Sequence, residues 1–255
     1  MPTLVFLVSA WLAFILGGNS AYITTIETRQ DPGFRLFMDG YTSIYIDPEC
    51  NDVQEGVFHD AWEDAKLLSK AQFGNVDGHG DDKPHKMWLG DSWNKRGSRY
   101  NAVTNERTGD IYKNIWSMKS LFDNQGTEEN ERIYWWCQDI RNECNEANIY
   151  GGYFKTTENI PQPDGPENFQ YNTAMTVLHE AYHYQNLVCD PPIDDHAWGA
   201  IDCYNLAHTY GTKKAYLNAD SYALDALAVY LQQTFNTEVP PAPEQWLDHF
   251  MPVTN

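Results

Sequence analysis

Four stretches of the chain repeat their apolar residues at the three- and four-residue spacing of an amphipathic helix. The segment 52–72 is the clearest case, because Trp62, Ala65 and Leu68 share one helix face there. Three further segments have a similar period and are expected to be helical, namely 110–123, 171–188 and 214–235. The pattern therefore predicts that helices form most of the fold.

Between the second and third helical segments the pattern changes to aromatic and β-branched runs, which are typical of strands. Such runs occupy 132–137 and 149–154, and we expect a strand at each. The pair Trp135 and Trp136 in the first run is interpreted as part of the core rather than of a substrate cleft. The sheet formed by these strands is expected to be short.

Two stretches rich in glycine, proline and polar residues, 74–97 and 160–168, are predicted to be loops. The first contains His79 and His85, which we interpret as solvated side chains rather than ligands. Helices, a short sheet and two further helices, in that order, predict a mostly helical α+β fold. No repeat or low-complexity linker marks a boundary, so we expect 22–255 to form a single domain.

The first apolar run of the chain, 4–16, carries no charge but is too short to span a bilayer. It is followed by small residues, among which Ser20 and Ala21 suit cleavage by signal peptidase. We therefore interpret 1–21 as a secretion signal peptide, and the alternative is an N-terminal membrane anchor. The remaining chain is expected to be secreted and extracellular, with no membrane attachment after cleavage.

Acidic residues outnumber basic residues by 36 to 17, which gives a formal net charge of −19. A surface of this charge repels phosphate backbones and anionic lipids, so nucleic acids and membranes are not expected partners. The same field attracts basic peptides and small cations. Because 42% of the residues are hydrophobic and 14% are aromatic, the chain can bury a core, and we expect a folded monomer.

Five cysteines follow the predicted signal peptide, namely Cys50, Cys137, Cys144, Cys189 and Cys203. An odd number leaves at least one thiol unpaired. Secretion favours disulfides, and no two of these cysteines have the Cys-x2-Cys spacing of a zinc ribbon. Cys189 and Cys203 are an attractive pair because their bond would close a short loop, although the sequence alone leaves the connectivity open.

The predicted helix 171–188 contains the motif His-Glu-x-x-His, formed by His179, Glu180 and His183. Histidines four residues apart lie on one face of a helix, so both imidazoles can reach a single Zn²⁺. Glu180 projects beside them, where it can take a proton from a metal-bound water. The motif predicts a catalytic zinc site, and the alternative is a surface helix with two unrelated histidines.

A catalytic zinc also needs a third protein ligand. The extended motif His-Glu-x-x-His-x-x-Gly-x-x-His is excluded, because Asn186 and Cys189 occupy the positions of its glycine and last histidine. A glutamate from a following helix is disfavoured, because no glutamate occurs between Glu180 and Glu238. The remaining candidates, besides the thiolates, are Asp190, Asp194, Asp195, His196, Asp202, His208, Asp220 and Asp225.

Two further motifs follow the histidines. The segment 195–199 reads Asp-His-Ala-Trp-Gly, and 218–222 reads Asn-Ala-Asp-Ser-Tyr. Together with His-Glu-x-x-His, they resemble the ordered motifs of the deuterolysin-like metallopeptidases, or aspzincins, which include fungal lysine-specific endopeptidases. A weaker likeness extends back through 132–137 to Cys50, so the resemblance covers roughly 50–235.

The resemblance implies a zincin-like metallopeptidase domain with the His-Glu-x-x-His motif on its active-site helix. It implies that His179, His183 and Asp195 bind Zn²⁺ and that Glu180 is the general base. It also implies that Asp220 lies near the pocket for the residue after the scissile bond and contributes to substrate binding. An alternative role for Asp220 is to accept a hydrogen bond from a ligand imidazole.

The chain departs from the family pattern near the expected site. Trp198 replaces a tyrosine whose hydroxyl is thought to support the oxyanion, and we include Trp198 among the catalytic residues because its indole N–H is also a donor. Ala223 replaces the glutamate of lysine-specific members, so strict lysine preference is not expected. Pro192 and Ile193 replace a Gly-Thr pair in a loop. A shift of that loop by one residue would make Asp194 the ligand.

These observations predict a secreted zinc-dependent endopeptidase that acts on peptide or protein substrates, with a possible preference for basic residues. Glu180 would deprotonate the zinc-activated water and then return the proton to the leaving amine. The second hypothesis is a secreted zinc-binding protein, such as a scavenger or surface antigen, with little or no turnover. Glu180 favours the enzyme, whereas Trp198 favours the alternative.

Overall fold

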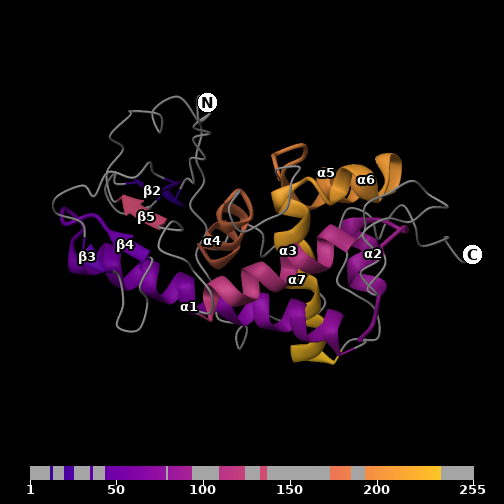
Figure 1. Ribbon diagram of the computed structural model, residues 1–255, viewed down its shortest axis with the longest axis horizontal. Coiled ribbons are helices and arrows are strands. Elements are labelled where there is room, and N and C mark those ends of the chain that lie inside the picture. Colours follow the sequence, from indigo (N-terminus) through magenta and orange to yellow (C-terminus); the bar gives the residue numbers. More distant parts are fainter. Residues whose placement is uncertain are drawn as a thin grey trace, which may run out of the picture.

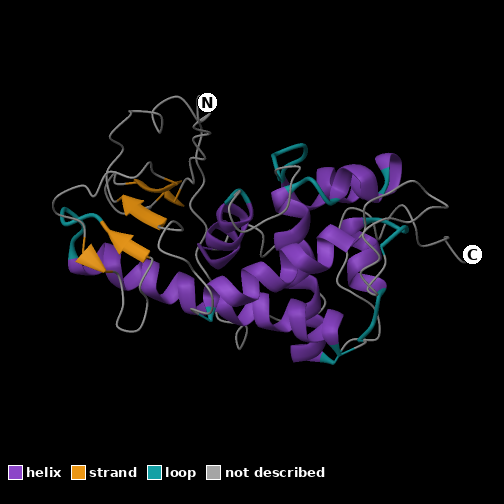
Figure 2. Cartoon of the chain, viewed as in Figure 1, coloured by secondary structure: helices purple, strands orange, loops and turns teal. Residues whose placement is uncertain are grey.

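The structure is a computed structural model that describes residues 12–13, 20–25, 35–36, 44–78, 80–93, 109–123, 133–136, 173–184 and 193–236. Within these ranges the chain is mostly helical and has a small sheet at one end of α1, in agreement with the predicted mixture (Figures 1 and 2). No helix in these ranges is long and apolar enough to cross a bilayer.

The sheet contains five short strands among the described residues, in the order β1-β2-β5-β4-β3. Their bounds are Leu12–Ala13 for β1, Ser20–Thr25 for β2, Arg35–Leu36 for β3, Ile44–Ile46 for β4 and Ile133–Trp136 for β5. Strands β4 and β5 are parallel, and the other neighbours are antiparallel. The prediction of a strand at 132–137 is confirmed as β5.

Some predictions lie outside what the structure describes. They include the strand at 149–154, the loop at 160–168, and the side chains of Trp135 and Trp136. The proposed signal peptide lies outside it except for β1 and the first two residues of β2. These expectations stay predictions.

Three of the described helices lie between β4 and β5 in the sequence, and the others follow β5. Their bounds are α1 (Asp52–Asp77), α2 (Lys83–Leu89), α3 (Gly109–Phe122), α4 (Thr173–Tyr182), α5 (Gly199–Asn205), the π-helix η4 (Leu206–Tyr210), α6 (Thr212–Ala215) and α7 (Ala219–Phe235). The predicted helices at 52–72 and 110–123 are confirmed as α1 and α3, and α1 continues as far as Asp77.

Helix α1 begins at a capping box. The side chain of Asn51 accepts hydrogen bonds from the amides of Val53 and Gln54, and the side chain of Gln54 accepts one from the amide of Asn51. From this start α1 packs against α3, α4 and α7. Helix α1 is therefore the element that α3, α4 and α7 all contact (Figure 1).

Aromatic side chains fill the space between these helices. The rings of Trp62 and Phe122 lie 4.5 Å apart and join α1 to α3, while Tyr182 and Tyr222 stack at 4.4 Å and join α4 to α7. All four side chains are fully buried. Tyr182 is one of the two variable positions of the His-Glu-x-x-His motif, so the core anchors the motif directly.

The predicted loop at 74–97 is wrong in two places, because α1 runs on to Asp77 and α2 forms at Lys83–Leu89. His85 is fully buried on α2 instead of being solvated. Its Nδ1 lies 2.8 Å from Asp225 Oδ1, and its Nε2 lies 3.1 Å from Asn75 Oδ1. These partners come from α7 and α1, and their hydrogen bonds compensate the burial of the His85 imidazole. The glycine-rich sequence around His85 gives no indication that this side chain is buried. His79 lies outside the described residues.

The two C-terminal helix predictions are correct in type but wrong in extent. Helix α4 ends at Tyr182, well before 188, and the amide of His183 bonds to the carbonyl of Glu180 in a tight last turn. The predicted helix 214–235 is divided into α6 and α7, with a break at 216–218. Helix α5 and the π-helix η4 were not predicted.

The buried carboxylate of Asp225 offers a test of the helix packing. It accepts hydrogen bonds from His85 Nδ1 and, at 2.6 Å, from Gln72 Nε2. Asp225→Ala should lower the free energy of unfolding by about 3–5 kcal/mol, because two buried donors lose their acceptor. Asp225→Asn keeps one acceptor oxygen and should lose less. Chemical denaturation measures both, and an alanine variant as stable as the parent would contradict this role.

Asp64 on α1 gives the fold a pH dependence. Burial, followed by the charges of Asp60 and Glu63, raises the pKa of Asp64 to about 6. The folded protein then keeps a proton that the unfolded chain releases between roughly pH 4 and pH 6, so stability falls as the pH rises through this window. Asp64→Asn removes the penalty.

We expect Asp64→Asn to raise the melting temperature at pH 7 by about 2–4 °C, after an allowance for solvent screening. Near pH 3 it should have no effect, because the parent carboxyl is then protonated in both states. Calorimetry at the two pH values provides the measurement. An equal gain at both would show that charge is not the cause.

Candidate metal centre

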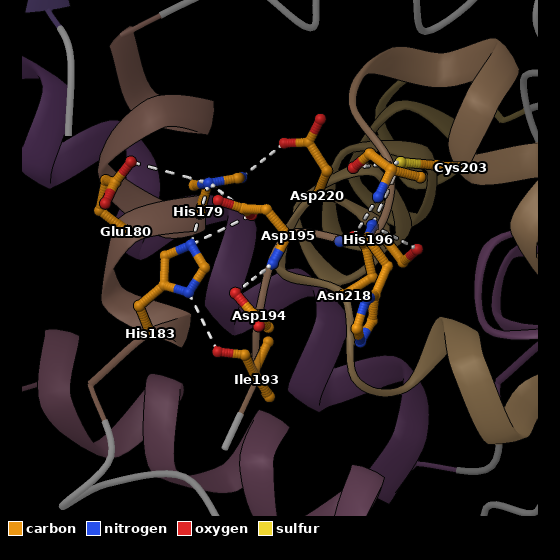
Figure 3. Close-up of polar contacts among 12 residues, drawn as sticks. His179, Glu180, His183, Ile193, Asp194, Asp195, His196, Cys203, Asn218 and Asp220 are labelled. Atoms are coloured by element: carbon orange, nitrogen blue, oxygen red, sulfur yellow. Dashed lines mark hydrogen bonds and ion pairs between the residues drawn. The ribbon is translucent and has the colours of Figure 1, made fainter. Parts of the chain in front are cut away.

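The candidate metal centre is formed by α4 with the turn that follows it and by the loop 193–198 that leads into α5 (Figure 3). His179, Glu180 and His183 from the first segment are all buried. Asp195 from the loop turns its carboxylate toward both imidazoles. The structure thus brings together the four residues that the sequence analysis assigned to metal binding and to the general base.

Three electron-pair donor atoms converge at this point. His179 Nε2 and His183 Nε2 are 3.2 Å apart, and Asp195 Oδ1 lies 3.3 Å from the first and 3.2 Å from the second. Nitrogen and oxygen ligands about 2.0–2.1 Å from a tetrahedral ion are about 3.3–3.4 Å from one another. The three separations therefore fit a single small divalent cation.

The opposite ring nitrogens of the two histidines have acceptors of their own. His179 Nδ1 donates to Asp220 Oδ1 at 2.6 Å, and His183 Nδ1 donates to the carbonyl of Ile193 at 3.1 Å. These bonds direct the Nδ1 atoms away from the centre, so that each Nε2 faces it and can offer a lone pair to a metal ion once that nitrogen is deprotonated. Asp195 Oδ1 is buried and has no hydrogen-bond partner among the described residues, so a cation would satisfy it.

Glu180 lies beside this point. Its Oε1 is 3.7 Å from His179 Nε2, and the two histidines with Glu180 form a buried group that could hold a metal ion. Distance alone therefore admits Glu180 as a ligand. Asp195 lies closer and contacts both imidazoles, which favours it as the third ligand and leaves Glu180 free to act on a neighbouring molecule.

Burial and charge together set the protonation of the cluster. Burial lowers the pKa of His179, but the charge and hydrogen bond of Asp220 outweigh it and bring the pKa to about 9. Burial raises the pKa of Glu180 to about 7 against the opposing charges of the two histidines. Metal binding would therefore displace a proton from His179, and Glu180 can both accept and release a proton near neutral pH.

The pKa of Asp195 is lowered, in contrast to the raised pKa values of His179 and Glu180. Burial acts to raise the pKa of its carboxyl, but contact with His183 and the charge of His179 hold that pKa below its usual value. The carboxylate is therefore ionised at neutral pH. An ionised carboxylate oxygen that has no hydrogen-bond partner in the described part of the chain and faces two imidazoles is a suitable ligand for a divalent cation.

Both carboxylate oxygens of Asp220 have partners within the protein. Oδ1 accepts from His179, and Oδ2 accepts from the amide of Gly199 at 2.7 Å. These contacts match the alternative role, in which Asp220 orients a ligand imidazole, and substrate binding by Asp220 stays a prediction. Ala223 is fully buried, and the expectation that the protein lacks a strict lysine preference stays a prediction.

Trp198 flanks the centre at the start of α5. Its ring stacks on the imidazole of His179, with centroids 5.0 Å apart and an interplanar angle of 30°, and 58% of the residue remains exposed. A molecule approaching His179 from this side would meet the indole first. Support of an oxyanion by Trp198 stays a prediction.

Several other candidate ligands have different surroundings. Asp194 is exposed, and its Oδ1 accepts from the amide of Asp195 at 2.9 Å. His196 and His208 are both exposed, and His208 lies against the ring of Tyr204. Asp202 is exposed on α5, Asp225 belongs to the buried contacts of His85, and Asp190 lies outside the described residues.

Cys203 has a free thiol, buried on α5, so the bond between Cys189 and Cys203, which the sequence analysis named as an attractive possibility, is not formed. Its Sγ lies 3.3 Å from Asn218 Nδ2 and 3.6 Å from the carbonyl of Ala197. The helix therefore directs this side chain inward, against the base of the loop that carries Asp195. The expectation of at least one unpaired thiol is confirmed.

The sequence analysis did not identify Asn218, which lies directly behind that loop. Its side chain contacts the loop backbone on the side away from the histidines (Figure 3). The sequence analysis placed Asn218 inside the predicted helix 214–235, so nothing there marked it as the residue before α7. The structure places it at the N-cap position of α7, where its side chain makes no capping hydrogen bond.

No protein-family model matches the sequence, and no curated protein matches it. The resemblance to the deuterolysin-like metallopeptidases therefore rests on the three motifs alone.

Proposed function

We propose that the chain is a secreted zinc-dependent endopeptidase with a zincin-like domain, which hydrolyses peptide bonds with Glu180 as general base. The observation that carries this proposal is the convergence of His179 Nε2, His183 Nε2 and Asp195 Oδ1 within 3.3 Å of one another. A buried glutamate stands next to the same point. Nitrogen and carboxylate ligands with an adjacent general base are the components of metal-assisted hydrolysis.

Zn²⁺ held by His179, His183 and Asp195 would lower the pKa of water and polarise a peptide carbonyl. The protein's own contribution is to orient these ligands. Asp220 and the Ile193 carbonyl fix the rotation of the two imidazoles, and α4 with the turn that follows it fixes their spacing. A preorganised set of this kind needs little rearrangement during the reaction.

Glu180 performs the proton transfers. Its carboxyl is buried, and Oε2 has no hydrogen-bond partner among the described residues, so it is available to a water molecule. Burial raises the pKa of this carboxyl, which favours acceptance of a proton from that water and its transfer to the leaving amine. The net charge of −19 supports a preference for basic peptides as substrates.

The second candidate is a secreted zinc-binding protein with little or no turnover. The observation that favours it is the exposed indole of Trp198 stacked on His179, at the position where the resembling family has a tyrosine hydroxyl. Both candidates require the same three ligands. They differ in whether zinc-loaded protein cleaves a peptide.

Glu180→Gln separates the two candidates. The amide fills the same space but cannot act as a base near neutral pH, so zinc should stay bound while peptide hydrolysis falls by about 10²–10⁴-fold. Zinc content and digestion of casein by the purified full chain measure the two effects. His196→Ala, a change in an exposed neighbour of Asp195, is the control and should leave both unchanged.

If the parent protein binds zinc but cleaves nothing, the binding-protein candidate is correct. If Glu180→Gln cleaves at the parental rate, Glu180 is not the base.

The third ligand is tested by a pair of adjacent variants. Asp195→Ala should weaken zinc binding by more than the roughly 10–100-fold typical of losing an outer-shell partner. Asp194→Ala should have a smaller effect, because Asp194 is exposed and its side chain accepts a single hydrogen bond, from the amide of Asp195. Competition with a chromophoric chelator measures both affinities. The reverse ranking would transfer the ligand role to Asp194.

A further inference from the structure

We infer that Asn218 is a positioning residue for the metal centre, which holds the loop 193–198 so that Asp195 completes the ligand set. This inference rests on the proposed zinc site. Its starting point is that Asp195 lies on a loop, whereas both histidines are fixed by α4 and its last turn. Something outside that helix must therefore fix the third ligand.

Asn218 contacts the loop immediately after Asp195. Its Oδ1 accepts hydrogen bonds from the amides of His196, at 2.7 Å, and Ala197, at 2.8 Å. The Asn218 side chain is fully buried. A single oxygen thus accepts hydrogen bonds from two successive backbone amides directly after the proposed ligand.

The amide nitrogen of Asn218 is equally engaged. Nδ2 donates to Ser221 Oγ at 3.0 Å and lies 3.3 Å from Cys203 Sγ. These two contacts fix the orientation of the side-chain amide and keep Oδ1 directed at the loop. Asn218 occupies the N-cap position of α7, but its side chain makes no hydrogen bond to the first amides of that helix. It bonds to the loop amides instead.

The backbone on the other side of Asp195 is fixed by the same segment. The amide of Asp194 donates to the carbonyl of Leu217 at 2.8 Å, and the amide of Ala219 donates to the carbonyl of Asp194 at 3.1 Å. The loop is therefore held on both sides of Asp195 by the break between α6 and α7. The side-chain torsions of Asp195 are the main freedom that remains to it.

The test compares three replacements of Asn218 in the full chain. Asn218→Ala and Asn218→Ser should each weaken Zn²⁺ binding by about 10–100-fold, since neither side chain can reach both amides. Asn218→Ser retains a residue favoured before a helix, which protects folding. Asn218→Asp should bind within about threefold of the parent, because its carboxylate accepts the same two bonds while Ser221 and Cys203 can donate to it.

The absorption spectrum of the Co²⁺-substituted protein reports the geometry of the ligands. We expect the parent and Asn218→Asp to give the intense bands of a tetrahedral site, and the alanine and serine variants to give weaker bands. Val229→Ala is the matched control, because it removes buried apolar contacts on the same helix and should lower the melting temperature without changing either metal readout.

Parental affinity and spectrum in both Asn218→Ala and Asn218→Ser would overturn the inference and leave the proposed zinc site intact. Losses in Val229→Ala that match those in the Asn218 variants would also overturn it, because general destabilisation would then be the cause. If the parent itself binds neither Zn²⁺ nor Co²⁺, the proposed function fails and the inference fails with it.

Discussion

The 2.6 Å hydrogen bond between His179 Nδ1 and Asp220 Oδ1 is the interaction on which the candidate site depends. It joins α4, which carries His179 and is followed by the turn that carries His183, to the first turn of α7. The other oxygen of Asp220 holds the amide of Gly199, where the loop enters α5. The Asp220 carboxylate therefore sets the rotation of the His179 imidazole and fixes the end of the loop that carries Asp195. Hydrogen bonds to both of its oxygens stabilise its charge.

Behind this bond, the helices are joined by a chain of buried polar contacts. The hydroxyl of Tyr182 donates to Gln72 Oε1 at 2.8 Å, and Gln72 Nε2 donates to Asp225 Oδ2, which also lies against His85. Polar groups buried together must all be satisfied at once, so such a chain permits few alternative packings. The back of the His-Glu-x-x-His motif is thereby fixed to α1 and α7 while its front faces the centre.

The parts of the site that depend on short spacing were predictable. Residues i and i+4 share a helix face, which located His179 and His183, and the resemblance of motifs singled out Asp195 from several acids. Contacts between distant segments were not predictable: the local pattern around His85 is that of a loop, yet its partners lie on α1 and α7. The break at 216–218 was also missed, because a continuous helical period runs across it and hydrogen bonds to the loop replace helix bonds there.

The thiol of Cys203 has a chemical consequence of its own. Burial raises the pKa of this thiol well above its ordinary value, so it stays protonated at neutral pH. The thiolate is the species that attacks a disulfide or reacts with peroxide, and a buried, protonated sulfur is a poor substrate for either reaction. An odd cysteine placed under the loop that carries Asp195 can therefore persist in an oxidising compartment without entering disulfide exchange with the other four.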